Sequence, residues 1–223
     1  MAKKISKSLS AAVSAEIKSK FDLNKFKSSK GLDKNVKFKE QKWIPLSPAF
    51  QEIAGVPGVP MGHISLLRGH SDTGKTTALL EAAVASQNMG QLPVFIITEM
   101  KWNWEHAAQM GLKVKLIKDD EGNVIDYEGN FIYVDRETLH TIEDVAAFIM
   151  DLQNEQKKGN LPYDLAFFWN SIGSIPCAMS VEKLKNNNEW NAGAMSTQFG
   201  NTVNQSIVMS RKESSPYTNT LIC

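Results

Sequence analysis

The chain has 223 residues, of which 42% are hydrophobic and 22% are charged. This composition is typical of a globular protein and excludes a wholly disordered chain, a coiled coil and a collagen-like fibre. No stretch approaches the roughly 20 apolar residues of a membrane span, and the start lacks the apolar segment of a secretory signal. Two cysteines, Cys177 and Cys223, are too few for a disulfide framework or a zinc site. We therefore expect a cytoplasmic protein with no membrane partner.

The net charge of +1 conceals an uneven distribution along the chain. Residues 1–42 contain 12 Lys and 4 Asp or Glu, a charge of +8. Residues 43–223 contain 13 Lys or Arg and 20 Asp or Glu, a charge of −7. A basic arm of this kind is compatible with a solvated tail, with contact to nucleic acid, and with docking on an acidic protein surface.

Residues 1–42 contain two short amphipathic patterns. Leu9, Val13, Ile17 and Phe21 recur every four residues and predict one face of a helix. Residues 36–39, Val-Lys-Phe-Lys, alternate as an edge strand does. Both apolar faces need cover, which either a neighbouring subunit or the chain's own domain can supply. We predict an oligomerisation arm over 1–42 and a core over 43–223.

From Trp43 onward, helical and strand patterns alternate. A loop-rich approach with a short helix over 48–53 leads to a strand over 63–67. The expected helices then cover 76–87, 104–110, 141–152 and 195–208, and the expected strands cover 93–97, 165–169 and 218–223. Two Glu-Gly-Asn triplets, at 121–123 and 128–130, indicate a surface hairpin. Alternation of this kind predicts an α/β fold with a mostly parallel sheet flanked by helices.

The segment Gly69-His-Ser-Asp-Thr-Gly-Lys-Thr76 has the spacing of a phosphate-binding loop, the P-loop. Its two glycines let consecutive backbone N–H groups approach phosphate, and the helix that follows adds the positive end of its dipole. Lys75 supplies a charge for the β- and γ-phosphates, and the Thr76 hydroxyl can ligate Mg²⁺. The motif follows a strand and opens a helix, which is the context that this chemistry needs.

Two polar residues follow strands that should neighbour the loop, where open parallel sheets bind ligands. Glu99 follows the strand over 93–97 and can orient an attacking water. Asn170 follows the strand over 165–169, where a P-loop enzyme carries a metal-binding aspartate. An amide can accept a hydrogen bond from a metal-bound water but gives no negative charge. Asp164 lies at the opposite end of that strand and cannot replace it.

The remaining polar candidates are weaker. His106 and His140 have no Cys or His at metal-ligand spacing. Lys183 and Lys185, followed by three asparagines from Asn186, form a polar basic loop that is either a solvated connection or a nucleic-acid contact.

The ordered blocks from Trp43 to Cys223 resemble the RecA family of strand-exchange recombinases, most closely its phage branch. They include Pro45-Leu-Ser47, Gly55-Val-Pro-Gly-Val-Pro-Met-Gly62, Arg68 to Thr77, Phe95-Ile-Ile-Thr-Glu99 and Asn170-Ser-Ile-Gly-Ser-Ile-Pro176. The resemblance implies a RecA-like core that binds ATP and Mg²⁺, forms helical filaments on single-stranded DNA and exchanges homologous strands. The host-cell cytoplasm is the expected location if a phage encodes the chain.

The resemblance also assigns roles to individual residues. ATP would contact Gly69, His70, Ser71, Asp72, Thr73, Gly74, Lys75, Thr76 and Thr77, with Asn103 and His106 at the adenine. As catalytic residues, Glu99 would position the attacking water and Lys75 would hold the triphosphate, and Thr76 and Asn170 would hold the metal. Residues 177–192 would form the first DNA-binding loop, with Lys183, Lys185, Asn186 and Asn187 as contacts.

Two departures from the family pattern leave alternatives open. Asn170 replaces the aspartate, and the strand begun at Thr218 stops at Cys223, which suggests a fragment or a truncated recombinase. A RecA-fold ATPase of another class, such as a helicase-type core, and a nucleotide-binding paralogue that does not hydrolyse ATP are the two alternatives.

Overall fold

The computed structural model describes residues 37–99, 102–185 and 203–223, and Phe38–Cys223 forms one compact unit. Its elements in chain order are β1 (Trp43–Pro45), α3 (Pro48–Ala54), β2 (Gly58–Pro60), β3 (Ile64–Ser65), α4 (Lys75–Asn88), β4 (Leu92–Ile97), α5 (Trp104–Gln109), β5 (Val114–Lys118), β6 (Val124–Gly129), β7 (Ile132–Asp135), α6 (Ile142–Lys158), β8 (Leu165–Asn170), a 3-10 turn (Ile172–Ser174), α7 (Ala178–Lys185), α9 (Gln205–Met209) and β9 (Thr220–Ile222).

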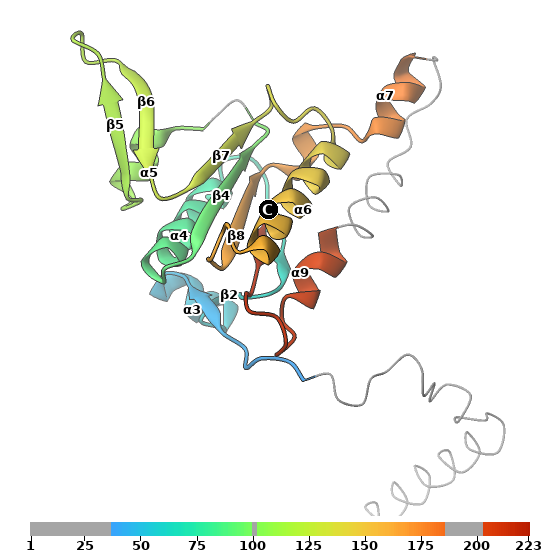
Figure 1. The fold of residues 1–223 in the computed structure, drawn as a ribbon. Coiled ribbons are helices and arrows are strands. Elements are labelled where there is room, and N and C mark those ends of the chain that lie inside the picture. Colours follow the sequence, from blue (N-terminus) through green and yellow to red (C-terminus); the bar gives the residue numbers. More distant parts are fainter. Residues whose placement is uncertain (1–36, 100–101, 186–202) are drawn as a thin grey trace, which may run out of the picture. The chain divides into compact units, whose positions relative to one another are not determined.

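A five-stranded sheet in the order β3-β9-β8-β4-β7 forms the centre of the unit, and every pairing in it is parallel. Figure 1 shows α4 on one face of this sheet and α6 on the other. Strands β1 and β2, and strands β5 and β6, form two separate antiparallel pairs. The predicted α/β class with a mostly parallel sheet is therefore confirmed.

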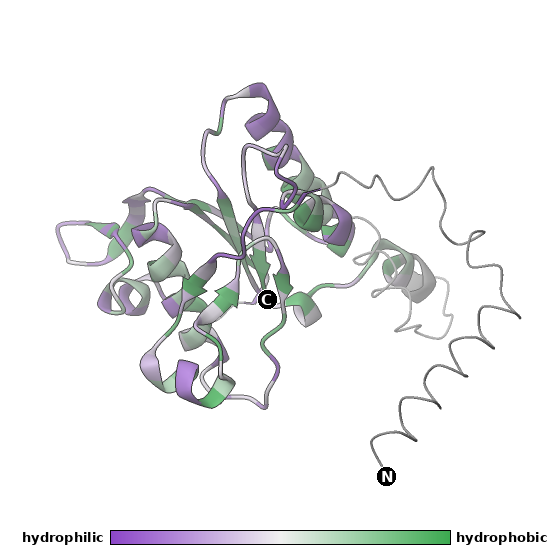
Figure 2. Cartoon of the chain, turned by 90° about the horizontal axis from the view of Figure 1, so that it is seen from below, coloured by the Kyte–Doolittle hydropathy of each residue, from purple (hydrophilic) through white to green (hydrophobic). Residues whose placement is uncertain are grey.

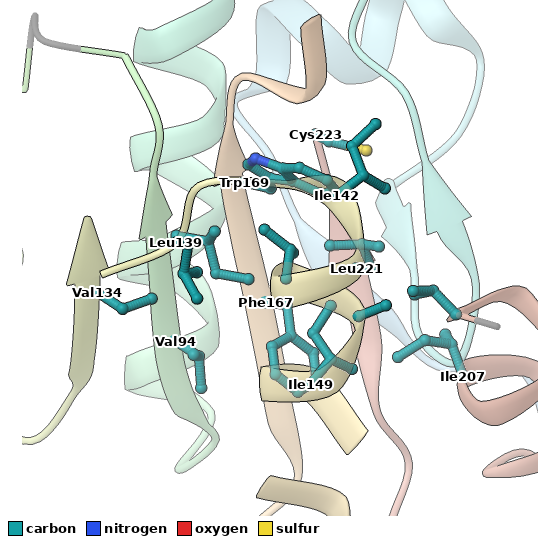
Figure 3. Packing of buried hydrophobic residues seen from close by; sticks show 14 of the residues in the cluster. Val94, Val134, Leu139, Ile142, Ile149, Phe167, Trp169, Ile207, Leu221 and Cys223 are labelled. Carbon is teal, nitrogen blue, oxygen red and sulfur yellow. The ribbon is translucent and has the colours of Figure 1, made fainter. Parts of the chain in front are cut away.

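Strands β4 and β8, two of the three interior strands, are buried along their whole length. Successive side chains point to opposite faces of a strand. Val94 and Phe167 accordingly pack on the α6 side with Ile149 (Figure 3), whereas Phe95 and Phe168 pack on the α4 side. Figure 2 shows the resulting contrast between hydrophobic central strands and hydrophilic outer helices and loops. Because both faces of the sheet are covered, both faces of β4 and β8 are buried, which explains why their sequences are continuously apolar.

Helix α6 begins where the sequence predicts. The Thr141 hydroxyl accepts a hydrogen bond from Asp144 N at 3.2 Å, and the Asp144 carboxylate accepts one from Thr141 N at 2.8 Å. This reciprocal pair satisfies two N–H groups that the first helical turn leaves free. The helix ends at Gly159, whose φ of 84° is the left-handed conformation that glycine adopts easily.

The end of the predicted arm packs against its own chain. Phe38 forms an antiparallel bridge with Lys212, and Lys39 Nζ donates to Tyr217 O at 2.9 Å and to Thr218 Oγ1 at 2.8 Å. Residues 1–36, with the predicted helical stripe, lie outside the described residues. The oligomerisation role of the arm therefore stays a prediction.

One predicted element differs from the structure, and another is described only in part. Residues 178–185, expected in a loop, form helix α7, because their sequence combines Ala, Met, Leu, Glu and Lys, which favour helices. The helix predicted over 195–208 is described only at its end, where α9 runs from Gln205 to Met209. Among the described residues, no helix is long and apolar enough to span a membrane.

The fold predicts a specific stability effect at Asn219. Its side chain exchanges two hydrogen bonds with the buried Gln156, at 2.9 and 2.7 Å, and accepts one from Leu165 N at 3.0 Å. Asn219→Ala leaves buried polar groups unpaired, so we expect it to lower the free energy of unfolding by about 3 kcal/mol. Urea denaturation measures this, with Asn160→Ala, a change at an exposed amide, as a control expected to cost less than about 1 kcal/mol.

Candidate functional site

The glycine-rich loop lies between β3 and α4, at the carboxyl edge of the sheet. The chain leaves β3 past Leu67, whose N–H donates to Cys223 O at 2.6 Å, and then passes through exposed residues before α4 begins at Lys75. Two of its positions need glycine. A Cβ on Gly69 would lie 2.7 Å from Thr73 Oγ1, and Gly74 has a φ of 86°.

The loop presents the amino end of a 14-residue helix to solvent. Gly74 is the N-cap of α4, and it has no side chain with which to cap the first turn. The first N–H groups of a helix have no partner within the helix and carry partial positive charge. The residues present at this edge therefore suit an anion such as phosphate.

Lys75 lies folded back over the loop. Its ammonium donates a hydrogen bond to His70 O at 2.5 Å, and the Thr73 hydroxyl donates to the same carbonyl at 2.9 Å. Both bonds cross the loop and tie its two ends together. An ammonium held by a neutral carbonyl can exchange that partner for a phosphate oxygen, which binds a cation more strongly.

Glu99 and Asn170 lie beside each other, as the sequence predicts for the ends of neighbouring parallel strands. Ile97 is in register with Asn170, and Thr98 N and Glu99 N donate to Asn170 O at 2.9 and 3.1 Å. The Asn170 side chain is buried. The Ser171 hydroxyl donates to Glu99 Oε1 at 3.1 Å, which fixes the carboxylate at the end of β4.

A second hydrogen-bonded layer supports this pair. The Thr98 hydroxyl donates to Ser171 O at 2.8 Å and accepts from Trp169 Nε1 at 3.0 Å. Thr98 and Trp169 are both fully buried, so these bonds hold the segment after β8 against the segment after β4. Sequence reasoning did not identify Thr98, although it stands directly before the predicted Glu99.

Asn103 has a local structural role. It caps α5, and its Oδ1 accepts a hydrogen bond from His106 N at 2.9 Å. The His106 side chain is exposed. Contact of either residue with adenine stays a prediction.

A cavity of about 310 Å³ opens next to Glu99, lined by Ile97, Glu99, Trp102, Tyr133, Asp135, Arg136 and Glu137. Tyr133 donates a hydrogen bond to the Asp135 carboxylate at 3.2 Å. Burial, followed by the negative charge of Asp135, raises the pKa of Tyr133 to about 12. Sequence analysis missed Tyr133 and Asp135, because no local pattern shows that their strand, β7, pairs with β4.

The remaining predicted site residues are only partly described. Lys183 and Lys185 belong to the last turn of α7, and Asn186 and Asn187 lie outside the described residues. Within the described ranges, no group of three His, Cys, Asp or Glu side chains is arranged to hold a metal ion.

Comparison with known proteins identifies distant relatives. No family model matches the chain. It is 28% identical over 147 residues to the RecA proteins of Thermotoga petrophila, Thermotoga sp. strain RQ2 and Thermotoga maritima. The match covers 64% of this chain and 41% of each relative, so the chain spans about two fifths of their length. The similarity supports a relation to the RecA family, whereas the phage branch and the truncation stay predictions.

The geometry predicts that nucleotide binding depends on Lys75. Replacing Lys75 by Ala removes the cation from a loop that otherwise presents backbone N–H dipoles, so we expect Mg·ATP affinity to fall at least about tenfold. Titration with a fluorescent ATP analogue measures the change. Lys158→Ala is the matched control, because Lys158 is exposed and pairs only with Glu155 on α6 among the described residues. Equal affinity in the two variants would contradict a phosphate site at the loop.

Proposed function

We propose that the chain is a RecA-type ATPase that assembles on single-stranded DNA and takes part in homologous pairing and strand exchange. The observation that carries the proposal is the glycine-rich loop at the uncapped start of α4, at the same edge of the sheet as Glu99 and Asn170. The similarity to three RecA proteins supports the recombination role. A cytoplasmic location, in a host cell if a phage encodes the chain, belongs to the same proposal.

ATP and Mg²⁺ would supply the phosphoryl group and the charge that polarises it. The loop from Gly69 to Thr77 would surround the phosphates with backbone N–H groups. Lys75 would exchange His70 O for phosphate oxygen, and the Thr76 hydroxyl would face the metal. Glu99, held by Ser171, would accept a hydrogen bond from the attacking water and orient it.

The DNA-binding part of the proposal rests on α7 and the residues after it. Lys183 and Lys185 end a helix that follows β8 at the same edge of the sheet as Glu99. Positive charge at this position suits a phosphate backbone. The basic arm would join protomers into a filament by docking on an acidic surface of the next copy.

The buried amide of Asn170 favours a second candidate, a nucleotide-binding protein with little hydrolysis. A carboxylate would contribute charge to the metal site, and an amide does not. The affinity for Mg·ATP would fall little, because Thr76 and the phosphates still hold the cation. The rate of ATP hydrolysis would fall more, because a fixed metal stabilises the charge of the transition state.

The DNA contact is tested by the salt dependence of binding. We expect Lys183→Ala with Lys185→Ala to weaken binding to an oligo(dT) in the presence of Mg·ATP. The slope of log affinity against log salt should fall by up to about 0.7 for each lost contact. Fluorescence anisotropy measures the slope, with Lys157→Ala and Lys158→Ala on α6 as the matched pair. An unchanged slope would show that Lys183 and Lys185 do not contact DNA phosphates.

A substitution at Asn170 distinguishes the ATPase from the nucleotide-binding protein with little hydrolysis. We expect Asn170→Asp to raise ATP turnover at least tenfold, or about 1.4 kcal/mol of barrier. Adding Glu99→Gln to that variant should abolish the gain. A coupled ATPase assay measures both. If Asn170→Asp leaves turnover unchanged while Glu99→Gln still removes it, the site hydrolyses ATP without the carboxylate and the second candidate fails.

A further inference from the structure

A cavity of about 220 Å³ is bounded by the end of α6, by α9 and by the segment that leads into β9. Helices α6 and α9 pack on the same face of the sheet, where Ile149 and Ile207 belong to one buried cluster (Figure 3). Asn219 lines the cavity directly before β9. Gln156 also lines it and donates to Tyr163 O, two residues before β8. The cavity therefore lies at the amino ends of these parallel strands, at the edge opposite to the candidate nucleotide site.

One buried hydrogen-bond donor at this cavity has no partner. Gln153 is among the lining residues and is only 8% exposed. Its Nε2 is shielded from solvent and makes no hydrogen bond with the part of the chain that the structure describes. A buried N–H group without an acceptor lowers the stability of a fold, and an acceptor supplied by a ligand would remove that penalty.

The other uncharged polar side chains of the lining already donate within the chain. Gln156 exchanges two hydrogen bonds with Asn219, at 2.9 and 2.7 Å. The hydroxyls of three serines donate to backbone carbonyl groups, Ser206 to Val203 O, Ser210 to Ile207 O and Ser215 to Tyr217 O. Gln153 is thus the amide whose donor is still free, and a ligand has to bring an acceptor to it.

A free cation stands beside this amide. Lys157 lines the cavity, is exposed and forms no ion pair within the described ranges. None of the described residues that line the cavity is Asp or Glu. An ammonium group and an unpaired amide N–H together favour a ligand with anionic oxygen, and a carboxylate offers one oxygen to each donor.

The rest of the lining is largely apolar. Met209, Pro216 and Tyr217 belong to it, and Met209 is 49% exposed. Methionine and aromatic side chains pack favourably on rings. An apolar cavity of about 150 Å³ already holds a benzene ring, so 220 Å³ leaves room for one ring with a short substituent. Inorganic phosphate would satisfy the two donors but would leave this apolar surface in water.

We propose that this cavity binds an apolar carboxylate. Its ring or side chain packs against Met209 and Pro216, and its carboxylate accepts hydrogen bonds from Gln153 Nε2 and the Lys157 ammonium. A free aromatic acid and the carboxy-terminal residue of a partner protein share this chemistry. The inference does not depend on the proposed function, because no residue of the cavity belongs to the candidate nucleotide or DNA site.

NMR titration of the ¹⁵N-labelled full chain tests the site, with phenylacetate as the probe. Phenylacetamide, acetate and inorganic phosphate are the controls, because each lacks either the charge or the ring. Phenylacetate should shift the amide signals of the lining residues saturably, with an affinity at least about tenfold higher than that of each control. Equal affinity for phenylacetate and any control, shifts confined to another region, or no saturable shift would each overturn the proposal.

Two substitutions test the donors separately. Gln153→Leu removes the unpaired buried N–H, so it should raise the urea midpoint of the free chain while lowering the affinity for phenylacetate at least about fivefold. Lys157→Gln should lower that affinity at least about threefold. Lys158→Gln is the matched control, because its ammonium already pairs with Glu155, and it should leave the affinity within about twofold. Unchanged affinity in Gln153→Leu or in Lys157→Gln would overturn the assignment of the carboxylate.

A longer probe distinguishes the two sources of the carboxylate. The peptide acetyl-Gly-Gly-Phe ends in the same ring and carboxylate as phenylacetate but adds a peptide backbone. Binding of the peptide at least about tenfold tighter than phenylacetate would identify the carboxy-terminus of a protein as the ligand. Equal or weaker binding of the peptide would identify a free acid.

Discussion

Strands β4 and β8 pair in parallel over six residues, from Leu92 with Leu165 to Ile97 with Asn170. Both strands are buried on both faces, so a shift of one residue would move the side chains to the opposite face and disrupt the packing of both core clusters. This register places the residues after the two strands beside each other, where Thr98, Glu99, Asn170 and Ser171 are joined by hydrogen bonds. The arrangement of the candidate site is therefore a consequence of core packing.

The glycine-rich loop depends on the same sheet at its other side. Leu67, which leads into the loop, is bonded to Cys223 after β9, and β9 pairs with β8. A continuous set of parallel strands thus connects the start of α4 with Glu99. Lys75 already lies across the loop, so binding of a phosphate requires the exchange of one hydrogen-bond partner.

The sequence predicted the parts of this arrangement that follow from local chemistry. The spacing of Gly69, Gly74 and Lys75 indicated the loop, and the apolar runs ending at Ile97 and Trp169 indicated the central strands. Features that depend on distant contacts were missed. Lys39 binds carbonyl and hydroxyl groups more than 170 residues away, and the cavity beside Glu99 includes Tyr133 from a strand whose position in the sheet no local pattern reveals.

The proposed function requires that nucleotide bound at this edge of the sheet promotes assembly on single-stranded DNA. Electron microscopy of the full chain with long single-stranded DNA, in parallel samples containing Mg·ATP and Mg·ADP, tests it most directly. We predict helical filaments along the DNA with Mg·ATP and sparse or no filaments with Mg·ADP. Closed rings, or DNA that stays bare in both nucleotides, would contradict it.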